Sequence, residues 1–159
     1  MFWKDWRGPM WKRKPLVWRN NEVSGFGPFE TIDFCAAAGI LPVMTTAAAD
    51  HTAEDMGDLI EYAFGDETTE WGKLRHEDQH PEPYNVTWFE LGNEQQNPFF
   101  AEQVAAMEER AAKVGVPPNT LHYLYPWGGG GAGIGGPRIK PGDTQNVSTI
   151  AYRIVQRCS

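Results

Sequence analysis

The sequence predicts an α/β fold built around a small parallel sheet. Three segments carry the 3.6-residue apolar period of helices, and three short apolar or alternating segments are typical of strands. The helical segments are residues 28–38, 52–64 and 98–114, and the strand segments are residues 40–46, 85–91 and 121–125. Strands that alternate with helices usually form right-handed βα units with parallel strands. This order leaves open whether the sheet is small and open or part of a larger one.

The first helix is expected to begin at Pro28, because proline is favoured in the first helical turn. Phe29, Ile32 and Ala36 recur at helical spacing and should form its buried face. Gly39 should end the helix as a C-cap. The run ILPVMTT that follows is short and apolar, as in a buried parallel strand, although its proline weakens the pattern.

The second helix has the clearest apolar face. Its apolar residues recur at i, i+3, i+4, i+7 and i+8, and they are Met56, Leu59, Ile60, Ala63 and Phe64. Thr52 and Asp55 resemble a capping box, and Gly65 follows the last turn. The polar residues 66–83 are predicted to form a long loop, and residues 1–27 another.

The third helix follows the second strand after a short polar segment. Asn97 is placed to cap it, and Pro98 is placed to take its first helical position. One face is apolar and consists of Phe100, Val104, Met107 and Ala111. Gly115 should end this helix, before the strand LHYLY.

Composition and charge narrow the class of partner. The net charge of −7 argues against a nucleic acid, whose phosphates demand a basic surface. No apolar run of roughly 18 residues indicates a transmembrane helix, so no membrane partner is expected. The N-terminus lacks the apolar core of a signal peptide, although secretion stays open if further sequence precedes it. The N-terminal basic residues are expected to form a solvated face: Lys4, Arg7, Lys12, Arg13, Lys14 and Arg19.

No metal or other cofactor is expected. The two cysteines, Cys35 and Cys158, show no CxxC spacing, and the four histidines show no HExxH spacing. His76 and His80 stand four residues apart, but the prolines beside them favour a loop over a helical metal site.

The C-terminal part differs in composition from the rest. Its GGGGAGIGGP run contains G-x-G-x-x-G, but prolines follow where a dinucleotide site needs a helix. A flexible linker is therefore the better interpretation, and residues 146–157 favour a last strand or short helix. We expect a folded domain over residues 1–126 and a Gly/Pro-rich linker with a short tail over residues 127–159.

The stretch YNVTWFELGNEQQ carries the strongest chemical signal. Its alternation is typical of a strand that ends at Gly92 and is followed by Asn93 and Glu94. Ligands of parallel α/β sheets bind beyond the carboxyl ends of the strands. A partly desolvated glutamic acid there keeps its proton more readily, as a general acid must. The alternative is a helix-capping Asn beside a solvated Glu, and the spacing alone does not decide between the two.

The motifs around this strand resemble those of one enzyme family. The segments WKDWRGP, GFGPFETIDFCAAAGILPVMTT and GKLRHEDQHPEPYNVTWFELGNE resemble, in the same order, the α-L-arabinofuranosidases of glycoside hydrolase family 51. The likeness spans roughly residues 2–115, and the lead-in to Asn93 is its most particular part. The resemblance implies a (β/α)8 TIM barrel, of which this chain would hold about three βα units.

The resemblance also implies roles for single residues. Glu94 would be the catalytic general acid/base, Asn93 would bind the sugar, and Trp3 would lie in a loop that walls the subsite. The substrate would be an arabinose-containing polysaccharide or oligosaccharide, cleaved with retention. Nothing after Tyr125 resembles the strand that carries the nucleophile, so we expect the isolated chain to be inactive.

Two other functions stay open at this point. The chain would instead be a non-catalytic carbohydrate-binding remnant if Trp3, Trp6 and Trp88 stack on sugars. Retaining glycosidases with a TIM barrel share the Gly-Asn-Glu ending. The chain would be an endoglucanase or xylosidase if the Asn-Glu pair reflects only this wider group. In either case a three-stranded sheet has unpaired edges, which favour association between chains.

Overall fold

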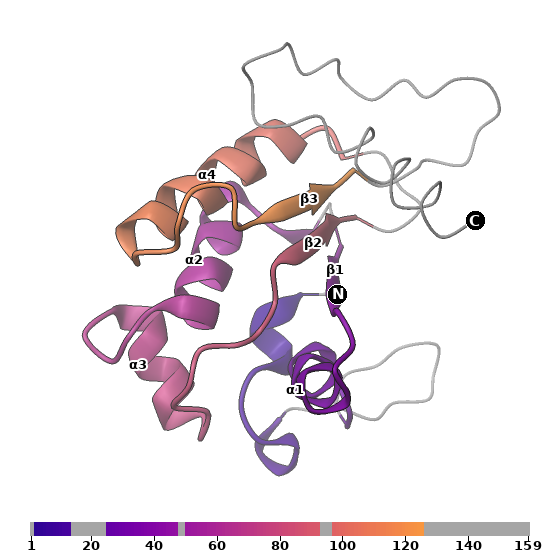
Figure 1. Ribbon diagram of the computed structural model, residues 1–159, viewed down its shortest axis with the longest axis vertical. Coiled ribbons are helices and arrows are strands. Elements are labelled where there is room, and N and C mark those ends of the chain that lie inside the picture. Colours follow the sequence, from indigo (N-terminus) through magenta and orange to yellow (C-terminus); the bar gives the residue numbers. More distant parts are fainter. Residues whose placement is uncertain (1, 14–24, 48–49, 93–96, 126–159) are drawn as a thin grey trace, which may run out of the picture.

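The three strands of the described chain form one parallel sheet, as predicted. The computed structural model describes residues 2–13, 25–47, 50–92 and 97–125. Its strands are β1 (Val43–Thr46), β2 (Trp88–Leu91) and β3 (His122–Leu124), in the order β1-β2-β3 (Figure 1). Both pairings are parallel, and Thr46 pairs with Leu91, so β1 and β2 end at the same edge.

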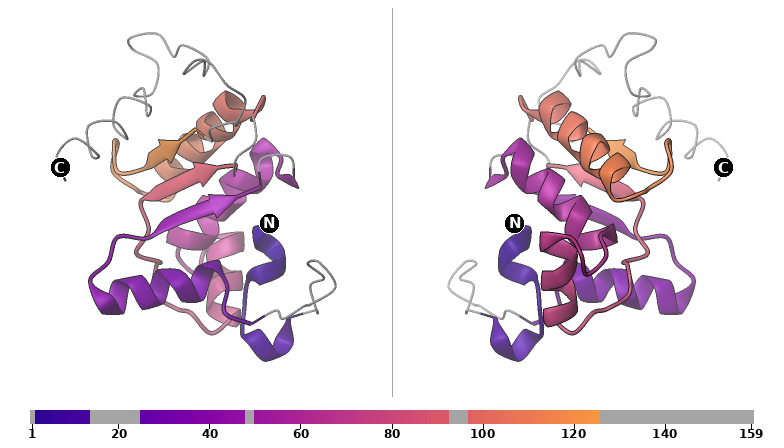
Figure 2. Two further views of the ribbon diagram at one scale, coloured as in Figure 1. Left: turned by 90° about the vertical axis from the view of Figure 1, so that its right-hand side faces the viewer. Right: turned by 90° about the vertical axis from the view of Figure 1, so that its left-hand side faces the viewer.

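Two helices cover one face of this sheet (Figure 2). They are α2 (Ala53–Phe64) and α4 (Phe100–Lys113), and the strand side chains that point to them are buried. Met44, Phe89 and Tyr123 share one register level on this face and are each at most 4% exposed. Alternate side chains such as Trp88 and Glu90 are half-buried on the other face. The core therefore lies on the helix side of the sheet.

The two long helices form for the reasons that their sequence patterns indicate. Thr52 Oγ1 accepts the backbone N–H of Asp55 and the Asp55 carboxylate accepts that of Thr52, which confirms the predicted capping box. The predicted apolar face of α4 is buried throughout. This helix begins at Phe100, however, and Pro98 lies in the preceding turn rather than in the first helical position. Asn97 accepts the backbone N–H of Phe99, one residue before the helix.

Helix α1 (Pro28–Ala38) packs beside β1 and only its first turns reach the core. Phe29 and Ile32 are buried as predicted, and Gly39 ends the helix in the left-handed conformation with φ 69°. Ala36 is exposed, contrary to the prediction, because the buried residues of α1 lie only in its first half.

The predicted loop over residues 66–83 is wrong, because it contains α3 (Glu70–Glu77). Thr69 Oγ1 caps this helix by accepting the N–H of Gly72. Its anchor is the guanidinium of Arg75, which is 1% exposed and donates to four backbone carbonyls. The acceptors are the carbonyl oxygens of Tyr62, Gly65, His80 and Pro81. These side chain to backbone bonds fix α3 together with Trp71 and Leu74, which pack against the core.

The N-terminal segment is also more ordered than a plain loop. Its described part contains two short 3₁₀ turns, η1 (Trp3–Trp6) and η2 (Met10–Lys12). Residues 126–159, including the predicted linker and tail, lie outside the described residues. In the described ranges no helix is long and apolar enough to cross a membrane.

Candidate functional site

The central strand β2 leads to the predicted catalytic pair. Gly92 follows its last residue directly, is buried, and has a φ of 122°, which side-chain-bearing residues rarely adopt. Asn93 and Glu94 come next in the sequence and lie outside the described residues. The structure thus establishes that the strand before the pair is central in a parallel sheet and ends in a sharp backbone turn.

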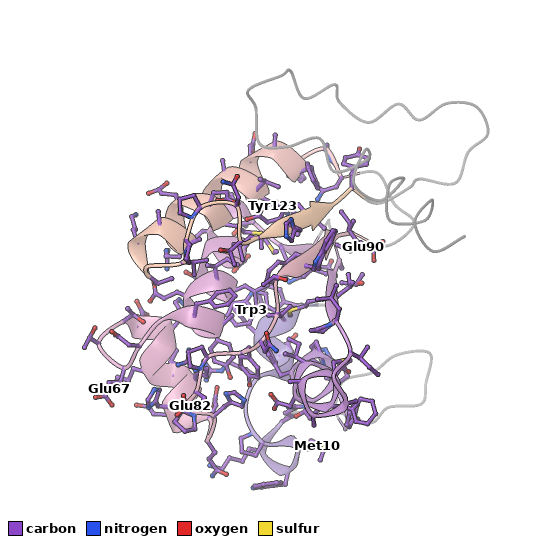
Figure 3. The ribbon with its side chains drawn as sticks, in the orientation of Figure 1. Trp3, Met10, Glu67, Glu82, Glu90 and Tyr123 are labelled. Carbon is purple, nitrogen blue, oxygen red and sulfur yellow. The ribbon has the colours of Figure 1, made fainter. Side chains whose placement is uncertain are left out.

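Sequence reasoning missed a carboxylate on the same strand. Glu90 is two residues before Gly92, and its Oε2 accepts the hydroxyl of Thr45 on β1 at 2.8 Å. Glu90 lies on the side of the sheet away from α2 and α4 (Figure 3). The sequence did contain a signal for Glu90. Strands of parallel sheets are usually apolar on both faces, so a carboxylate within the strand WFEL is unusual.

The face of the sheet away from α2 and α4 also carries an aromatic pair. The rings of Trp88 on β2 and His122 on β3 have centroids 4.5 Å apart and planes tilted by 31°. Both side chains are half-buried. Two register levels further along, Glu90 pairs with Leu124, so a polar group lies next to the rings toward the C-terminal edge of the sheet.

Trp3 lies in the core and not on a surface (Figure 3). Its side chain is 0% exposed, its indole N–H donates to the Asp55 carbonyl at 2.8 Å, and its ring lies 5.2 Å from that of Trp71. A sugar stacks on an aromatic ring that offers an exposed face. The structure therefore gives Trp3 the role of fastening η1 to α2, with no exposed face for a sugar.

The N-terminal basic residues within the described ranges are largely paired, which corrects the expected solvated face. Lys4 Nζ contacts Asp55 and Asp58 at 2.6 and 2.8 Å, and Arg7 Nε contacts Asp78 at 3.1 Å. Burial tends to lower the pKa of Lys4, but the hydrogen bonds that its ammonium donates to the two aspartates outweigh this effect and raise the pKa. These cations hold the N-terminal segment against the helices.

The backbone carbonyls at the ends of β1 and β2 are bonded by polar side chains. Leu91 O, the last carbonyl of β2, accepts the Nδ2 of Asn97 at 2.8 Å. Ala47 O, just after β1, is bonded by the Nδ1 of His51 at 2.7 Å. Burial lowers the pKa of His51, although the bond to Ala47 acts in the opposite direction. Within the described ranges no three His, Cys, Asp or Glu side chains gather as a metal site would require.

Comparison with known proteins identifies the class. A family model described as the alpha-L-arabinofuranosidase 1 domain matches residues 1–116. This chain belongs to that family of glycosidases. It is 33% identical over 114 residues to an extracellular exo-alpha-L-arabinofuranosidase of Streptomyces chartreusis, covering 60% of this chain and 14% of the relative. Alpha-L-arabinofuranosidase C of Emericella nidulans is 32% identical over 114 residues, covering 70% of this chain and 22% of the relative.

Solved structures show the same relationship. The α-L-arabinofuranosidase of Thermotoga maritima, solved as an arabinose complex, matches with a TM-score of 0.58 and 26% identity. The match covers 77% of this chain and 27% of that one. A family 51 enzyme of Bifidobacterium longum gives a TM-score of 0.61 at 21% identity, which supports the fold alone. The chain thus spans a minor part of the length of each of these relatives.

Proposed function

We propose that residues 1–126 form part of the catalytic domain of an α-L-arabinofuranosidase, with Glu94 as general acid/base and Asn93 as a ligand of the sugar. One observation carries the proposal. In a chain of this family, the central strand of a parallel sheet ends at Leu91, and Gly92 and then the Asn-Glu pair follow it in the sequence. This is the edge of a parallel sheet at which ligands bind.

The sheet is proposed to be a section of a (β/α)8 barrel, followed by a linker and tail over residues 127–159. Three features support this: the strands are parallel, helices α2 and α4 cover one face, and the other face carries half-buried Trp88 and Glu90. Parallel sheets are normally covered on both faces. Further strands closing around that face would bury it.

The proposed reaction is hydrolysis of a terminal arabinofuranosyl bond with retention. Glu94 gives its proton to the glycosidic oxygen as the bond breaks, while a second carboxylate attacks the anomeric carbon. Glu94 then takes a proton from the water that releases the sugar. The two carboxyl groups of retaining enzymes lie about 5–5.5 Å apart. We propose that a part of the enzyme beyond this match supplies the nucleophile, so the 159-residue chain by itself does not turn over substrate.

A chimera tests the assignment of Glu94. Residues 1–116 would replace the matching segment of the Streptomyces chartreusis enzyme, and hydrolysis of a nitrophenyl arabinofuranoside would be measured. We expect activity, and we expect Glu94→Gln to lower it by at least about 100-fold. Glu102→Gln, which alters an exposed carboxylate on α4, is the matched control and should change little. An active chimera that tolerates Glu94→Gln would refute the assignment.

The isolated chain should be assayed on the same substrate. We expect no turnover, because double displacement needs both carboxylates. Turnover that disappears in Glu94→Gln would show that the nucleophile is present in this chain after all.

A non-catalytic role in carbohydrate binding is the second candidate, and the Trp88–His122 ring pair on the sheet face away from α2 and α4 favours it. It predicts binding to arabinan or arabinoxylan that survives Glu94→Ala and is lost in Trp88→Ala. Isothermal titration with these glycans measures it, and absence of binding by the wild-type chain removes this candidate. The family match favours an arabinofuranosidase over the endoglucanase or xylosidase alternative.

A further inference from the structure

Two strand ends at the candidate site are held by side chains of the segments that follow them. Thr46 and Leu91 are paired, so the carbonyls of Ala47 and Leu91 come at the end of the ladder between β1 and β2. His51 Nδ1 bonds the first carbonyl at 2.7 Å and Asn97 Nδ2 donates to the second at 2.8 Å. His51 is 4% exposed and Asn97 is 2% exposed. Buried carbonyls need such partners, because an unmade bond there is costly.

One side chain on α4 joins these two anchors. Gln103 is 1% exposed; its Oε1 accepts Asn97 Nδ2 at 2.7 Å, and its Nε2 donates to the His51 carbonyl at 2.8 Å. The amide thus acts as acceptor toward one anchor and as donor toward the other. The connection continues to the N-terminal segment, since His51 Nε2 accepts the backbone N–H of Trp3 at 3.1 Å.

We propose that Gln103 is a positioning residue that fixes His51, which follows β1, and Asn97, which follows β2, relative to each other. The inference rests on the proposed function, because the loop that leaves β2 leads to Glu94. Gln103 does not act on a substrate itself. It holds Asn97 and the main chain of His51, and these hold the two strand ends.

The chemistry of the amide makes the idea testable. Methionine has nearly the same length but neither a strong donor nor a strong acceptor. An ionised glutamate accepts hydrogen bonds and donates none, so it would face the His51 carbonyl unfavourably. A protonated glutamic acid has one donor and one acceptor and can reproduce the pattern. A buried Glu also has a raised pKa, so both forms can be reached under native conditions.

The hydrogen bonds of Gln103 to Asn97 and to the His51 carbonyl are called the tie below. Hydrogen exchange of two backbone amides in the full chain reports on this tie. The Phe99 N–H bonds to Asn97 Oδ1 at 3.0 Å, and the Trp3 N–H bonds to His51. In Gln103→Met we expect the protection factors of both amides to fall by about tenfold, the equivalent of one hydrogen bond. Val104→Ala is the matched control, since it removes buried packing from the next residue of α4 without removing a polar group. It should leave both protection factors near their wild-type values.

Rescue by the conservative variant separates positioning from general stability. In Gln103→Glu we expect low protection at about pH 9 and recovery toward wild type at about pH 6.5, where the carboxyl is protonated. Gln103→Met should show no such recovery. The proposal is overturned if Gln103→Met behaves as Val104→Ala does, or if Gln103→Glu gives the same protection at both pH values.

The same samples keep this inference separate from the proposed function. The carboxyl carbon of Glu94 can be titrated by NMR, with Glu94→Gln used to assign it. If the two amides respond and removal of the Gln103 amide also shifts the Glu94 titration, both ideas are supported. If the amides respond and Glu94 titrates as an exposed glutamate in every variant, the tie stands and the acid/base assignment is weakened. If the amides do not respond, the tie is refuted whatever Glu94 does.

Discussion

The side chain of His51 has both ring nitrogens occupied in a way that requires the neutral form. Nδ1 donates to the Ala47 carbonyl, and Nε2 must remain an acceptor for the Trp3 N–H. Adding a proton would place two N–H groups against each other. Burial also lowers the pKa of this imidazole, as expected for a group that is taken out of water.

The free energy of unfolding should therefore decrease as the pH decreases, because of His51. The unfolded imidazole has a pKa of about 6.5 and the folded one is lower, so the unfolded state takes up the proton first as the pH falls. The contribution of His51 is complete above pH ~6.5 and is lost as the pH drops toward the folded pKa. Urea unfolding at about pH 7.5 and about pH 5.5 measures it.

The variants give this prediction its control. His51→Gln should flatten the pH dependence in this window, while His76→Gln on α3 should keep it. An unchanged slope in His51→Gln would show that other groups cause the loss.

At the scale of elements, two helical glycines with opposite surroundings test the packing of α2 and α3. A Cβ added at Gly57 in α2 would lie 3.5 Å from the Ala106 carbonyl oxygen, an ordinary contact. A Cβ at Gly72 in α3 would collide with the carbonyl oxygen of Asp66 and lie 2.6 Å from Thr69 Oγ1. The second position therefore has no room for a side chain.

Alanine substitutions should have opposite effects at these two positions. Gly57→Ala should raise the free energy of unfolding by about 0.5–1 kcal/mol, because alanine favours helix and fits the space. Gly72→Ala should lower it by about 1–3 kcal/mol, since the backbone must shift. Thermal or urea unfolding measures both, and equal effects at the two positions would contradict the helix positions described here.

The elements differ in how far their sequence predicted them. α2 and α4 were predictable because their apolar residues recur at helical spacing and face a sheet. α3 was not, because its anchor Arg75 is a charged residue that sequence reasoning places on the surface. The strand leading to Gly92 was predictable from alternation. Gln103 was not, since its partner His51 lies 52 residues earlier and only the folded chain brings them together.

For the whole molecule, the sheet of the described chain has an unpaired edge on β1. Val43 on this strand is 46% exposed, and the nearby Ile40 and Leu41 are 55% and 61% exposed. An open apolar strand edge pairs readily with another chain. We therefore expect the 159-residue chain to self-associate, which sedimentation velocity over a range of concentrations would detect.

A charge on the edge should reduce this association. Val43→Lys places an ammonium on β1, whereas Phe34→Lys replaces a 59% exposed apolar residue on α1 and serves as the control. The expected result is less association in Val43→Lys than in Phe34→Lys. A wild-type chain that is monomeric and melts cooperatively would contradict the open-edge account.

The most direct test of the central claim compares leaving groups in the chimera carrying Glu94→Ala. A sugar oxygen in arabinan leaves only with a proton, while a dinitrophenolate leaves without one. If Glu94 is the general acid, kcat/KM for arabinan should fall by about 100-fold or more, and kcat/KM for the dinitrophenyl arabinofuranoside should fall far less. An equal fall for both substrates would contradict the assignment of Glu94 as the proton donor.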